Sequence, residues 1–516
     1  MPPPLEGDRP GCNPLQSCSA LGAKESRVAQ LRLHPDRALP AGDDIRAVAR
    51  RIYQSTKGLP LLCMHGHVEA AVFADDEGFS DPAHLLVVPD HYVTRMLMSQ
   101  GVPLADLGVP RVDGEAVETD PRQIWRRFCA HWHLFRGTPS RYWLEHEIAE
   151  VLKIDIAPGP DTADLLYDLI QARLAEPGFR PRALLDTFNI ELISTTDPAT
   201  STLDDHARLA AAGFGARVIP TFRPDALTHV NAGGWAGRVR QLQEISGVDT
   251  GDYDGFLAAL RSRREAFVLA GARATDHGHL TAAAEPLPPA EARRIYREAC
   301  QGGVSAEAAA AFAGHLLFEM ARMSCDDGLV MQIHPGVLRD HDDAIHAAFG
   351  SDRGFDIPVT AEFTRALRPM LNAFGRDPNF RLVLFTVDES VYSRELAPIA
   401  GVYPSVRLGA PWWFLDSPDG MRRFRELVTE TAGFYNTSGF VDDTRAFLSI
   451  PARHDLARRI DAGYLARLVV EHRLSEEEAV ETAADLAYRL PQQAYAPAGA
   501  GAAGRGDAGT EVSGLG

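Results

Sequence analysis

The sequence predicts an α/β protein built on a (β/α)₈ barrel, with a helical insertion after the first strand. Eight short apolar, β-branched runs recur along the chain, each followed by polar residues, glycine or proline. Helix-length segments with a 3.6-residue hydrophobic period, such as 421–431 and 462–472, separate these runs. This alternation is typical of parallel strands with helical crossovers, and eight such units close into a barrel.

The apolar runs define the predicted strands in order. Their ranges are 61–65, 191–195, 217–221, 267–272, 330–334, 382–386, 406–409 and 439–441. The chain has 516 residues, of which 45% are hydrophobic, so it is long enough for a barrel and an insertion.

More than a hundred residues separate the first two runs, and residues 120–152 between them have a helical pattern with several aromatic side chains. We therefore expect residues 73–184 to form a helical insertion in a barrel made of residues 31–72 and 185–490. Residues 1–30, rich in proline, glycine and serine, are expected to be a mobile segment. Residues 491–516, rich in alanine and glycine, are expected to be a disordered tail.

The charge and the cysteines limit the possible partners and compartment. A net charge of -18 argues against nucleic acid or anionic membranes as partners, and an anionic substrate would require arginines in the pocket. The sequence has neither an apolar run that could span a bilayer nor the pattern of a secretory signal. Six scattered cysteines indicate reduced thiols, so we expect a cytoplasmic protein.

Polar residues close nearly every predicted strand. His65-Gly66-His67 ends the first, and residues two apart in a strand face the same side. In a barrel, the C-terminal strand ends meet at one face, where catalytic groups lie. The other candidates at these ends are Arg223, Asp276, His277, His334, Trp412, Trp413, Asp443 and Arg445.

Each of these residues alone has an ordinary structural explanation, as a hydrogen-bonded histidine, a helix cap, a salt bridge or a packed aromatic ring. Their combination is more informative. His65 and His67 on one strand, His334 four strands later and an aspartate on the last strand make a mononuclear divalent-metal set with an open position.

These residues resemble the amidohydrolase superfamily and, more closely, the uronate isomerase (glucuronate isomerase) family. The resemblance runs from about residue 33 to about residue 472. Its motifs are His65-x-His67, Asp90-His91-Tyr92-x-x-Arg95, Thr195-Thr196-Asp197-Pro198, Arg223-Pro224-Asp225, Asp276-His277-Gly278, Gln332-Ile333-His334 with Arg339, Trp412-Trp413-Phe414, Asp419-Gly420-Met421 and Asp443-Thr444-Arg445-x-Phe447-Leu448-Ser449.

The resemblance implies an amidohydrolase-type barrel that interconverts hexuronate aldoses and ketoses, D-glucuronate with D-fructuronate and/or D-galacturonate with D-tagaturonate. It also implies one divalent metal held by His65, His67 and Asp443. Zinc is the favoured ion, with Mn²⁺ and Fe²⁺ as alternatives. His334 would lie beside the metal, as a ligand or, as we favour, as a hydrogen-bonding group to substrate.

The resemblance further assigns the reaction to four kinds of group. Tyr92 is the candidate base for the C2 proton, and Arg445 or Arg95 would lower its pKa, while Asp443 would double as the base that opens the sugar ring. Arg223 and Arg339 would grip the substrate carboxylate. His91, Arg95, Asp276 and His277 would contact the substrate. Trp412 and Trp413 would lie against the sugar, although core packing is an equal alternative for Trp413.

Three departures from the family pattern leave the preferred hexuronate open. Phe222 precedes Arg223, the segment 386–389 lacks an Asn-Pro pair, and Pro335 follows His334. Two other functions remain as alternatives. One is a mononuclear hydrolase such as a sugar lactonase, since residues 269–276 lack the lysine of two-metal relatives. The other is a barrel without chemistry. Association into a homo-oligomer also stays open.

Overall fold

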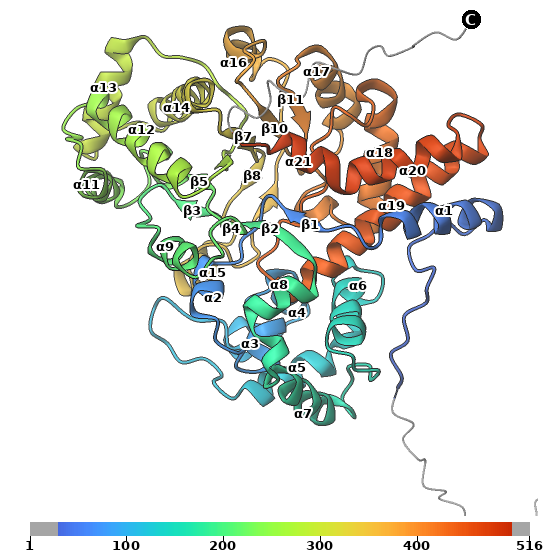
Figure 1. Ribbon diagram of the computed structural model, residues 1–516. Helices are drawn as coiled ribbons and strands as arrows, with labels where there is room; N and C mark the ends of the chain where they lie inside the picture. The colour runs from blue at the N-terminus through green and yellow to red at the C-terminus, as the bar shows by residue number, and fades with distance from the viewer. Residues whose placement is uncertain (1–28, 498–516) are drawn as a thin grey trace, which may run out of the picture.

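The computed structural model describes residues 29–497 and confirms the α/β class (Figure 1). Short parallel strands lie at the centre, and helices surround them. The strands are β1 (Leu61–Cys63), β2 (Ile190–Ser194), β3 (Asp197–Pro198), β4 (Val218–Ile219), β5 (Phe222–Arg223), β6 (Ala274–His277), β7 (Val330–Ile333), β10 (Leu382–Leu384) and β11 (Val406–Leu408). A separate antiparallel pair, β8 (Val337–Leu338) and β9 (Ile357–Pro358), lies in the loop after β7.

The central strands pair in the order β1-β2-β4 and β3-β5-β6-β7-β10-β11. Because β3 continues β2 and β5 continues β4 along the chain, the two sheets follow one another. The segment after β11 extends this order through backbone hydrogen bonds of 2.9 Å, from Leu408 N–H to Asn436 O and from Ser438 N–H to Leu408 O. Farther along this segment, Asp443 N–H donates to His65 O and Thr444 O accepts from His67 N–H, so it also pairs with the residues after β1. Backbone hydrogen bonds therefore connect eight chain segments in a closed ring.

One predicted strand is wrong, and another is weaker than expected. Residues 267–269 end the helix α12 (Tyr253–Leu269), and the strand begins later, as β6. Leu269 is 89% exposed, which a central strand does not allow, whereas Phe267 packs in the core. A short apolar run has no period that separates a strand from the last turn of a helix. The predicted last strand, 439–441, has no strand geometry of its own, although Thr437 forms a parallel bridge with Leu408.

The chain between β1 and β2, all of it described, is helical apart from loops and one isolated bridge at Ile156. These helices form the lower part of Figure 1. Aspartates accept from backbone N–H groups at several of their N-termini, as Asp90 does from Tyr92 N at 2.8 Å. The helices are α2 (Ala70–Asp75), α3 (Pro82–Leu86), α4 (His91–Met98), α5 (Pro121–Ala130), α6 (Pro139–His146), α7 (Ala163–Leu174) and α8 (Pro181–Thr187).

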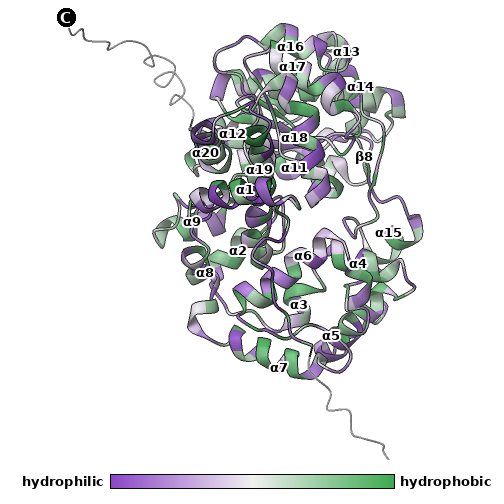
Figure 2. Ribbon diagram, turned by 90° about the vertical axis from the view of Figure 1, so that its right-hand side faces the viewer, coloured by the Kyte–Doolittle hydropathy of each residue, from purple (hydrophilic) through white to green (hydrophobic). Residues whose placement is uncertain are grey.

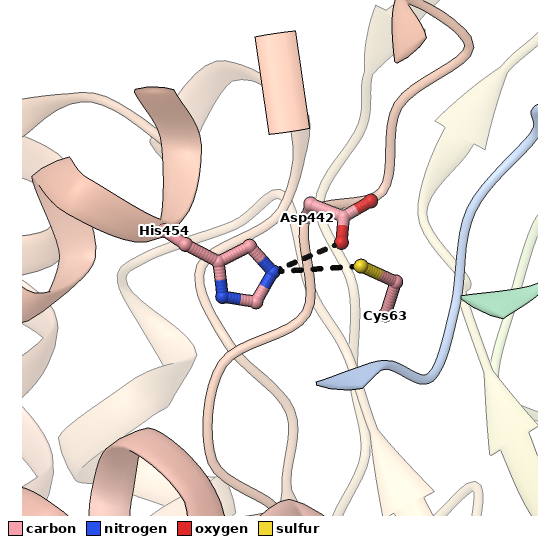
Figure 3. A group of neighbouring side chains, drawn as sticks. All are labelled: Cys63, Asp442 and His454. Atoms are coloured by element: carbon pink, nitrogen blue, oxygen red, sulfur yellow. Dashed lines mark hydrogen bonds and ion pairs between the residues drawn. The ribbon is translucent and has the colours of Figure 1, made fainter. Parts of the chain in front are cut away.

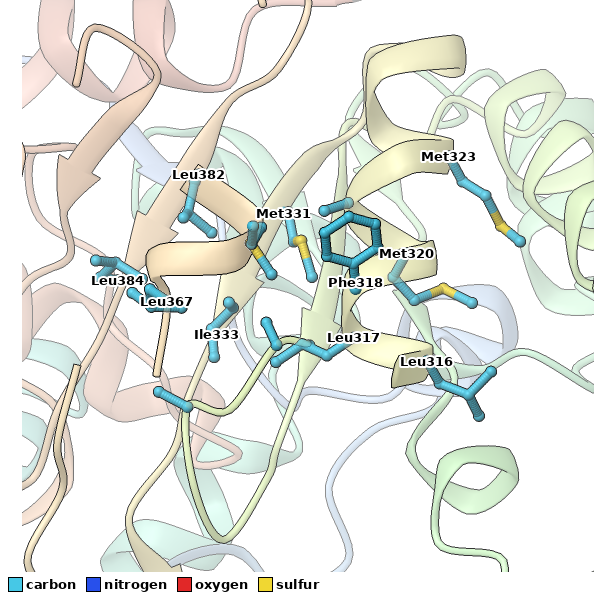
Figure 4. Packing of buried hydrophobic residues seen from close by; sticks show 14 of the residues in the cluster. Leu316, Leu317, Phe318, Met320, Met323, Met331, Ile333, Leu367, Leu382 and Leu384 are labelled. Atoms are coloured by element: carbon cyan, nitrogen blue, oxygen red, sulfur yellow. The ribbon is translucent and has the colours of Figure 1, made fainter. Parts of the chain in front are cut away.

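Alternation along the strands divides the core into two parts. Met331 and Ile333 of β7 face the surrounding helices and lie toward α14 (Ala306–Asp327), and Leu382 and Leu384 of β10 belong to the same cluster, with Leu384 beside Leu367 (Figure 4). Val330 and Val383 belong instead to a second cluster with residues of β1, β2, β4 and β6, which is the interior of the ring. The surface helices carry both hydrophilic and hydrophobic stretches, as Figure 2 shows, and bury their apolar faces on this core.

Both ends of the described chain are tied to the fold. Gln30 forms an antiparallel bridge with Ile156, so the segment expected to be mobile would end before it. At the other end, α21 (Leu490–Ala494) continues past residue 490, and Tyr495 is fully buried in the ring interior. Its hydroxyl donates to Gln332 Oε1 at 2.9 Å. The expected tail would therefore begin after Tyr495; residues 1–28 and 498–516 lie outside the described residues.

None of the helices within residues 29–497 combines the length and apolarity needed to cross a membrane.

We predict that Tyr495 stabilises the barrel from inside. Tyr495→Ala should lower the free energy of unfolding by about 3–5 kcal/mol, as expected for loss of a fully buried aromatic ring. Tyr495→Phe keeps the ring and removes one hydrogen bond, so it should cost only about 1 kcal/mol. Urea unfolding followed by tryptophan fluorescence measures both variants. Equal, small losses for the two variants would contradict a packing role.

Candidate active site

A cavity of about 400 Å³ opens where the strands end, and it brings most of the predicted site residues together. Those on its wall are His65, His67, His91, Tyr92, Arg223, Asp276, His334, Arg339, Trp412, Trp413, Asp443 and Arg445. The structure adds Asp90, Asp340, Ser351, Asp352, Asp356 and Thr444. The cavity therefore joins the barrel to the helical segment that follows β1.

The predicted metal ligands meet at one point. Asp443 Oδ1 lies 3.4 Å from His65 Nε2 and 3.0 Å from His67 Nε2. Ligand atoms around a tetrahedral zinc ion lie about 3.4 Å apart, so these separations suit a divalent ion. Burial opposes ionisation of Asp443, but His65 and His67 outweigh it and hold the carboxyl pKa well below its usual range. The group can therefore hold a divalent metal, with Asp443 as an anionic ligand.

A second pair of candidate ligands lies against the first group. The His334 ring stacks on His65 at 4.6 Å between centroids, and its Nδ1 lies 2.8 Å from Asp276 Oδ1. Burial lowers the pKa of His334, so the ring is neutral near pH 7. Its Nε2 is buried and has no hydrogen-bond partner among the described residues. His334 can thus complete a metal shell or bind substrate beside it, which are the two roles expected for it.

The backbone is strained at two residues of the cavity wall. Asp443 has φ 39° and Trp413 has φ 52°, values in the left-handed region that side chains other than glycine rarely adopt. Such conformations cost about 1–3 kcal/mol each and persist where the surroundings fix them. Trp413 is also buried and packs on Phe414 and Trp412, so its ring serves core packing as well as the cavity wall.

Three buried side chains, Cys63, Asp442 and His454, lie together and fix the two chain segments that carry the metal ligands (Figure 3). His454 Nε2 lies 3.1 Å from Asp442 Oδ2 and 3.8 Å from Cys63 Sγ. Asp442 precedes Asp443, and Cys63 is two residues before His65. His454 comes from the long helix α19 (Ile450–Val470). The trio therefore joins the first strand, the last segment and a helix behind the ligands.

Three arginines on the cavity wall are each held by a carboxylate. Arg223 Nε donates to Asp225 Oδ2 at 2.8 Å, and Arg339 Nη1 donates to Asp356 Oδ2 at 2.7 Å. Arg445 Nη2 donates to Asp352 Oδ2 at 2.6 Å. A guanidinium has five N–H groups, so each arginine keeps donors for a ligand after its anchor is made.

The arginines do not by themselves make the cavity positive. Six carboxylates and three guanidinium groups line it among the described residues. Coulomb repulsion at this short range would disfavour an anionic substrate. The two positive charges of a divalent metal, added to the arginines, would offset most of this excess. The arginines that an anionic substrate would require are thus present, but they would act together with the metal ion.

Tyr92 differs from the sequence-based expectation in its charged neighbours. Its hydroxyl donates to Asp416 Oδ2 at 3.0 Å, and the nearby cation is Arg453, whose guanidinium carbon lies 5.5 Å from the ring centroid. Burial, followed by Asp416, raises the pKa of Tyr92 well above its ordinary value, although Arg453 opposes this. Arg453 is the arginine that acts against this rise, whereas the sequence led us to expect Arg445 or Arg95 in that role.

Two predicted residues lie off the cavity wall. The Arg95 guanidinium lies over the Phe414 ring, with its carbon 5.0 Å from the centroid. His277 is fully buried, with Nε2 2.9 Å from Thr275 Oγ1. Asp416 and Arg453 were not predicted from the sequence. Arg453 lies on α19, most of whose residues are buried, and the arginines within its apolar sequence were the available signal.

Comparisons with known proteins agree with this geometry. The profile of the family described as glucuronate isomerase matches residues 45–495. The chain is 55% identical to a uronate isomerase of Rhizorhabdus wittichii over 91% of this chain and 99% of that protein. A uronate isomerase of Rhizobium meliloti is 53% identical over 90% of this chain and 99% of the relative.

Solved structures give the same result. A glucuronate isomerase from Caulobacter crescentus aligns with a TM-score of 0.88 at 48% identity, covering 90% of this chain and 97% of that one. A uronate isomerase from Thermotoga maritima aligns with a TM-score of 0.83 at 27% identity, covering 90% and 99%.

We predict that the His65, His67 and Asp443 group determines metal content. Asp443→Asn and His67→Gln should each reduce tightly bound divalent metal to well below one ion per chain, since loss of one ligand leaves an incomplete shell. Elemental analysis of dialysed protein measures this without an activity assay. His34→Gln, at an exposed histidine, is the matched control. Full metal content in Asp443→Asn would exclude this carboxylate as a ligand.

Proposed function

Because this chain belongs to the glucuronate isomerase family, we propose that its cavity interconverts a hexuronate aldose and its ketose. The substrate pairs are D-glucuronate with D-fructuronate and/or D-galacturonate with D-tagaturonate. The observation that carries this conclusion is the meeting of His65, His67 and Asp443 with three anchored arginines in one cavity. A site of this kind suits a small acidic sugar, which needs both an electrophilic centre and cationic partners.

The metal group fits a resident divalent ion, for which we propose zinc, with Mn²⁺ and Fe²⁺ as alternatives because mixed nitrogen and oxygen sites accept several ions. When bound, the ion would stabilise negative charge on substrate oxygens. His65, His67 and Asp443 would hold it. Asp276, whose Oδ1 lies 2.8 Å from His334 Nδ1 and whose Oδ2 lies 3.4 Å from Arg223 Nη1, would contact substrate hydroxyls together with His334.

We assign the substrate carboxylate to Arg223 and Arg339. Carboxylates hold both in place, and Arg339 also lies over the Trp413 ring, 5.5 Å from its centroid. Prepositioned guanidinium groups lose little freedom when they bind and can grip a carboxylate through two N–H groups. Fixing C6 in this way would set the distance of C1 and C2 from Tyr92 and Asp443. Arg445 would bind hydroxyls near the reacting carbons.

Tyr92 is our proposed base for the C2 proton, and Asp443 would also open the sugar ring. The phenol enters the reaction neutral, since its pKa is raised. Its O–H points to Asp416, so the oxygen lone pairs are free to face the cavity. His91 stacks on Tyr92 with centroids 5.2 Å apart and completes this wall.

A lactonase is the alternative from the same fold. It would need a water molecule as nucleophile, whereas the isomerase moves hydrogen within one molecule. No lysine lines the cavity among the residues that the structure describes, so a two-metal hydrolase of the lysine-bridged type lacks its bridging residue. The four described cysteines are free thiols, which supports our proposal of a cytoplasmic enzyme.

We predict that the purified protein converts at least one hexuronate to its ketose. In ¹H NMR, the anomeric signals of glucuronate or galacturonate should decrease while ketose signals appear. A uronolactone assayed in parallel should release no acid above the buffer rate. Acid release without ketose formation would favour the lactonase instead.

We predict that Arg223→Met raises KM for the uronate about 10- to 100-fold, because a charge-assisted hydrogen bond contributes about 1.5–3 kcal/mol. Metal content should stay unchanged, since Arg223 is not a ligand. Steady-state kinetics and elemental analysis check the two statements. Arg208→Met, at an exposed arginine paired with Asp75 and Asp205, is the control. A KM like that of the unmodified protein would remove Arg223 from the carboxylate site.

A further inference from the structure

A base with a raised pKa needs a second group that takes its own proton. Tyr92 carries its phenolic proton near pH 7, because burial and Asp416 raise its pKa. It can accept a proton from C2 only if its own proton leaves in the same step. Within residues 29–497, the acceptor in contact with that proton is Asp416 Oδ2, 3.0 Å from the Tyr92 hydroxyl oxygen.

Asp416 is held in place for this contact. It caps the short 3₁₀ turn 413–415 after β11, its backbone N–H donates to Trp413 O at 3.1 Å, and the residue is buried. Arg453 Nη1 donates to the same Oδ2 at 2.8 Å. Its other oxygen, Oδ1, is buried and has no hydrogen-bond partner among the described residues. A buried carboxylate oxygen without a hydrogen bond costs free energy of folding, so its presence calls for an explanation such as a role in the reaction.

Arg453 is a fixed counter-charge for this pair. It is buried, its Nε donates to Ser449 Oγ at 3.1 Å, and its guanidinium lies 3.7 Å from the centroid of the Trp143 ring. Burial raises the pKa of the Asp416 carboxyl to about 6, and the Arg453 guanidinium opposes this rise. Asp416 is therefore mainly a carboxylate near pH 7 and becomes neutral on accepting one proton.

Resting on the proposed role of Tyr92, we propose that Asp416 is a positioning residue that takes the Tyr92 phenolic proton while Tyr92 takes the substrate C2 proton. The C2–H bond breaks and a new Tyr92 O–H bond forms, while the former phenolic O–H bond breaks and an O–H bond forms on Asp416 Oδ2. The C2–H electron pair becomes the second C1–C2 bond, and the carbonyl pair moves onto the C1 oxygen.

The second half of the reaction reverses these transfers. Tyr92 gives its proton to C1, and Asp416 returns its own to Tyr92. A proton moves from the C2 oxygen to the C1 oxygen, the C2 carbonyl forms, and both side chains regain their starting state. No oxidant, reductant or further reactant is needed. A purely structural Asp416, needed only to neutralise Arg453, would require no contact with Tyr92.

The test measures C2–H cleavage directly, with C2-deuterated glucuronate or galacturonate, whichever the protein uses, in single turnover. Asp416→Asn keeps the size of the side chain and removes its basicity, so deuterium loss should slow about 100-fold or more. KM and metal content should change less than about threefold. Asp419→Asn, an exposed aspartate three residues on that pairs with Arg422, is the matched control and should react normally.

A double-mutant comparison separates this inference from the proposed role of Tyr92. If Asp416 acts through Tyr92, Asp416→Asn should add no further loss in a Tyr92→Phe background. Equal losses in both backgrounds, or normal cleavage in Asp416→Asn while Tyr92→Phe is inactive, would overturn the inference alone. Normal cleavage in Tyr92→Phe would overturn the role of Tyr92 itself.

A measurement on the unmodified protein covers the case in which Asp416→Asn fails to fold. The phenolic proton exchanges with solvent, so its transfer during C2–H cleavage should slow single turnover about twofold in D₂O. The absence of any solvent isotope effect on C2–H cleavage would overturn the relay, because a base that gives up no exchangeable proton would show none.

Discussion

The site depends on one pair of backbone hydrogen bonds that joins the last segment of the barrel to the first. His67 N–H donates to Thr444 O at 2.9 Å, and Asp443 N–H donates to His65 O at 3.2 Å. These bonds place side chains that are far apart in the sequence within ligand distance of one another. They also explain how Asp443 is kept at a positive φ, since the backbone is bonded on this side and its neighbour Asp442 is fixed by His454.

Around this junction, each buried or cavity-lining arginine named above is paired with an aspartate. Each cavity arginine has a carboxylate anchor, and Arg453 serves Asp416 in the same way deeper in the protein. Burying an ion without a partner would cost several kcal/mol of folding free energy, so this pairing lets the cavity contain many charged groups without a large loss of stability. They also fix the guanidinium planes before a substrate arrives, which reduces the ordering cost of binding.

The sequence was most informative where a residue type has few roles. The His-x-His pair, the aspartate of the last segment and the arginines at strand ends were predicted because such groups are rare in a core, and the cavity contains them. The strand at 267–272 was misplaced because an apolar run of six fits a helix end equally well. Both Asp276 and His277 stand at the end of a strand and were predicted for that reason. Successive residues of a strand face opposite sides, so Asp276 faces the cavity whereas His277 bonds to Thr275. Asp416 and Arg453 could not be found by that rule, since one lies in a turn, the other lies on a helix, and their partnership exists only in three dimensions.

The position of Tyr495 inside the ring has a consequence for biosynthesis. Its side chain fills the inside of the barrel and bonds to Gln332 of β7, yet the ribosome makes residue 495 after every described strand. The strands can associate earlier, but their interior stays incompletely filled until this tyrosine arrives. Folding during translation thus produces a barrel with an open, apolar inside, which is the kind of surface that chaperones bind.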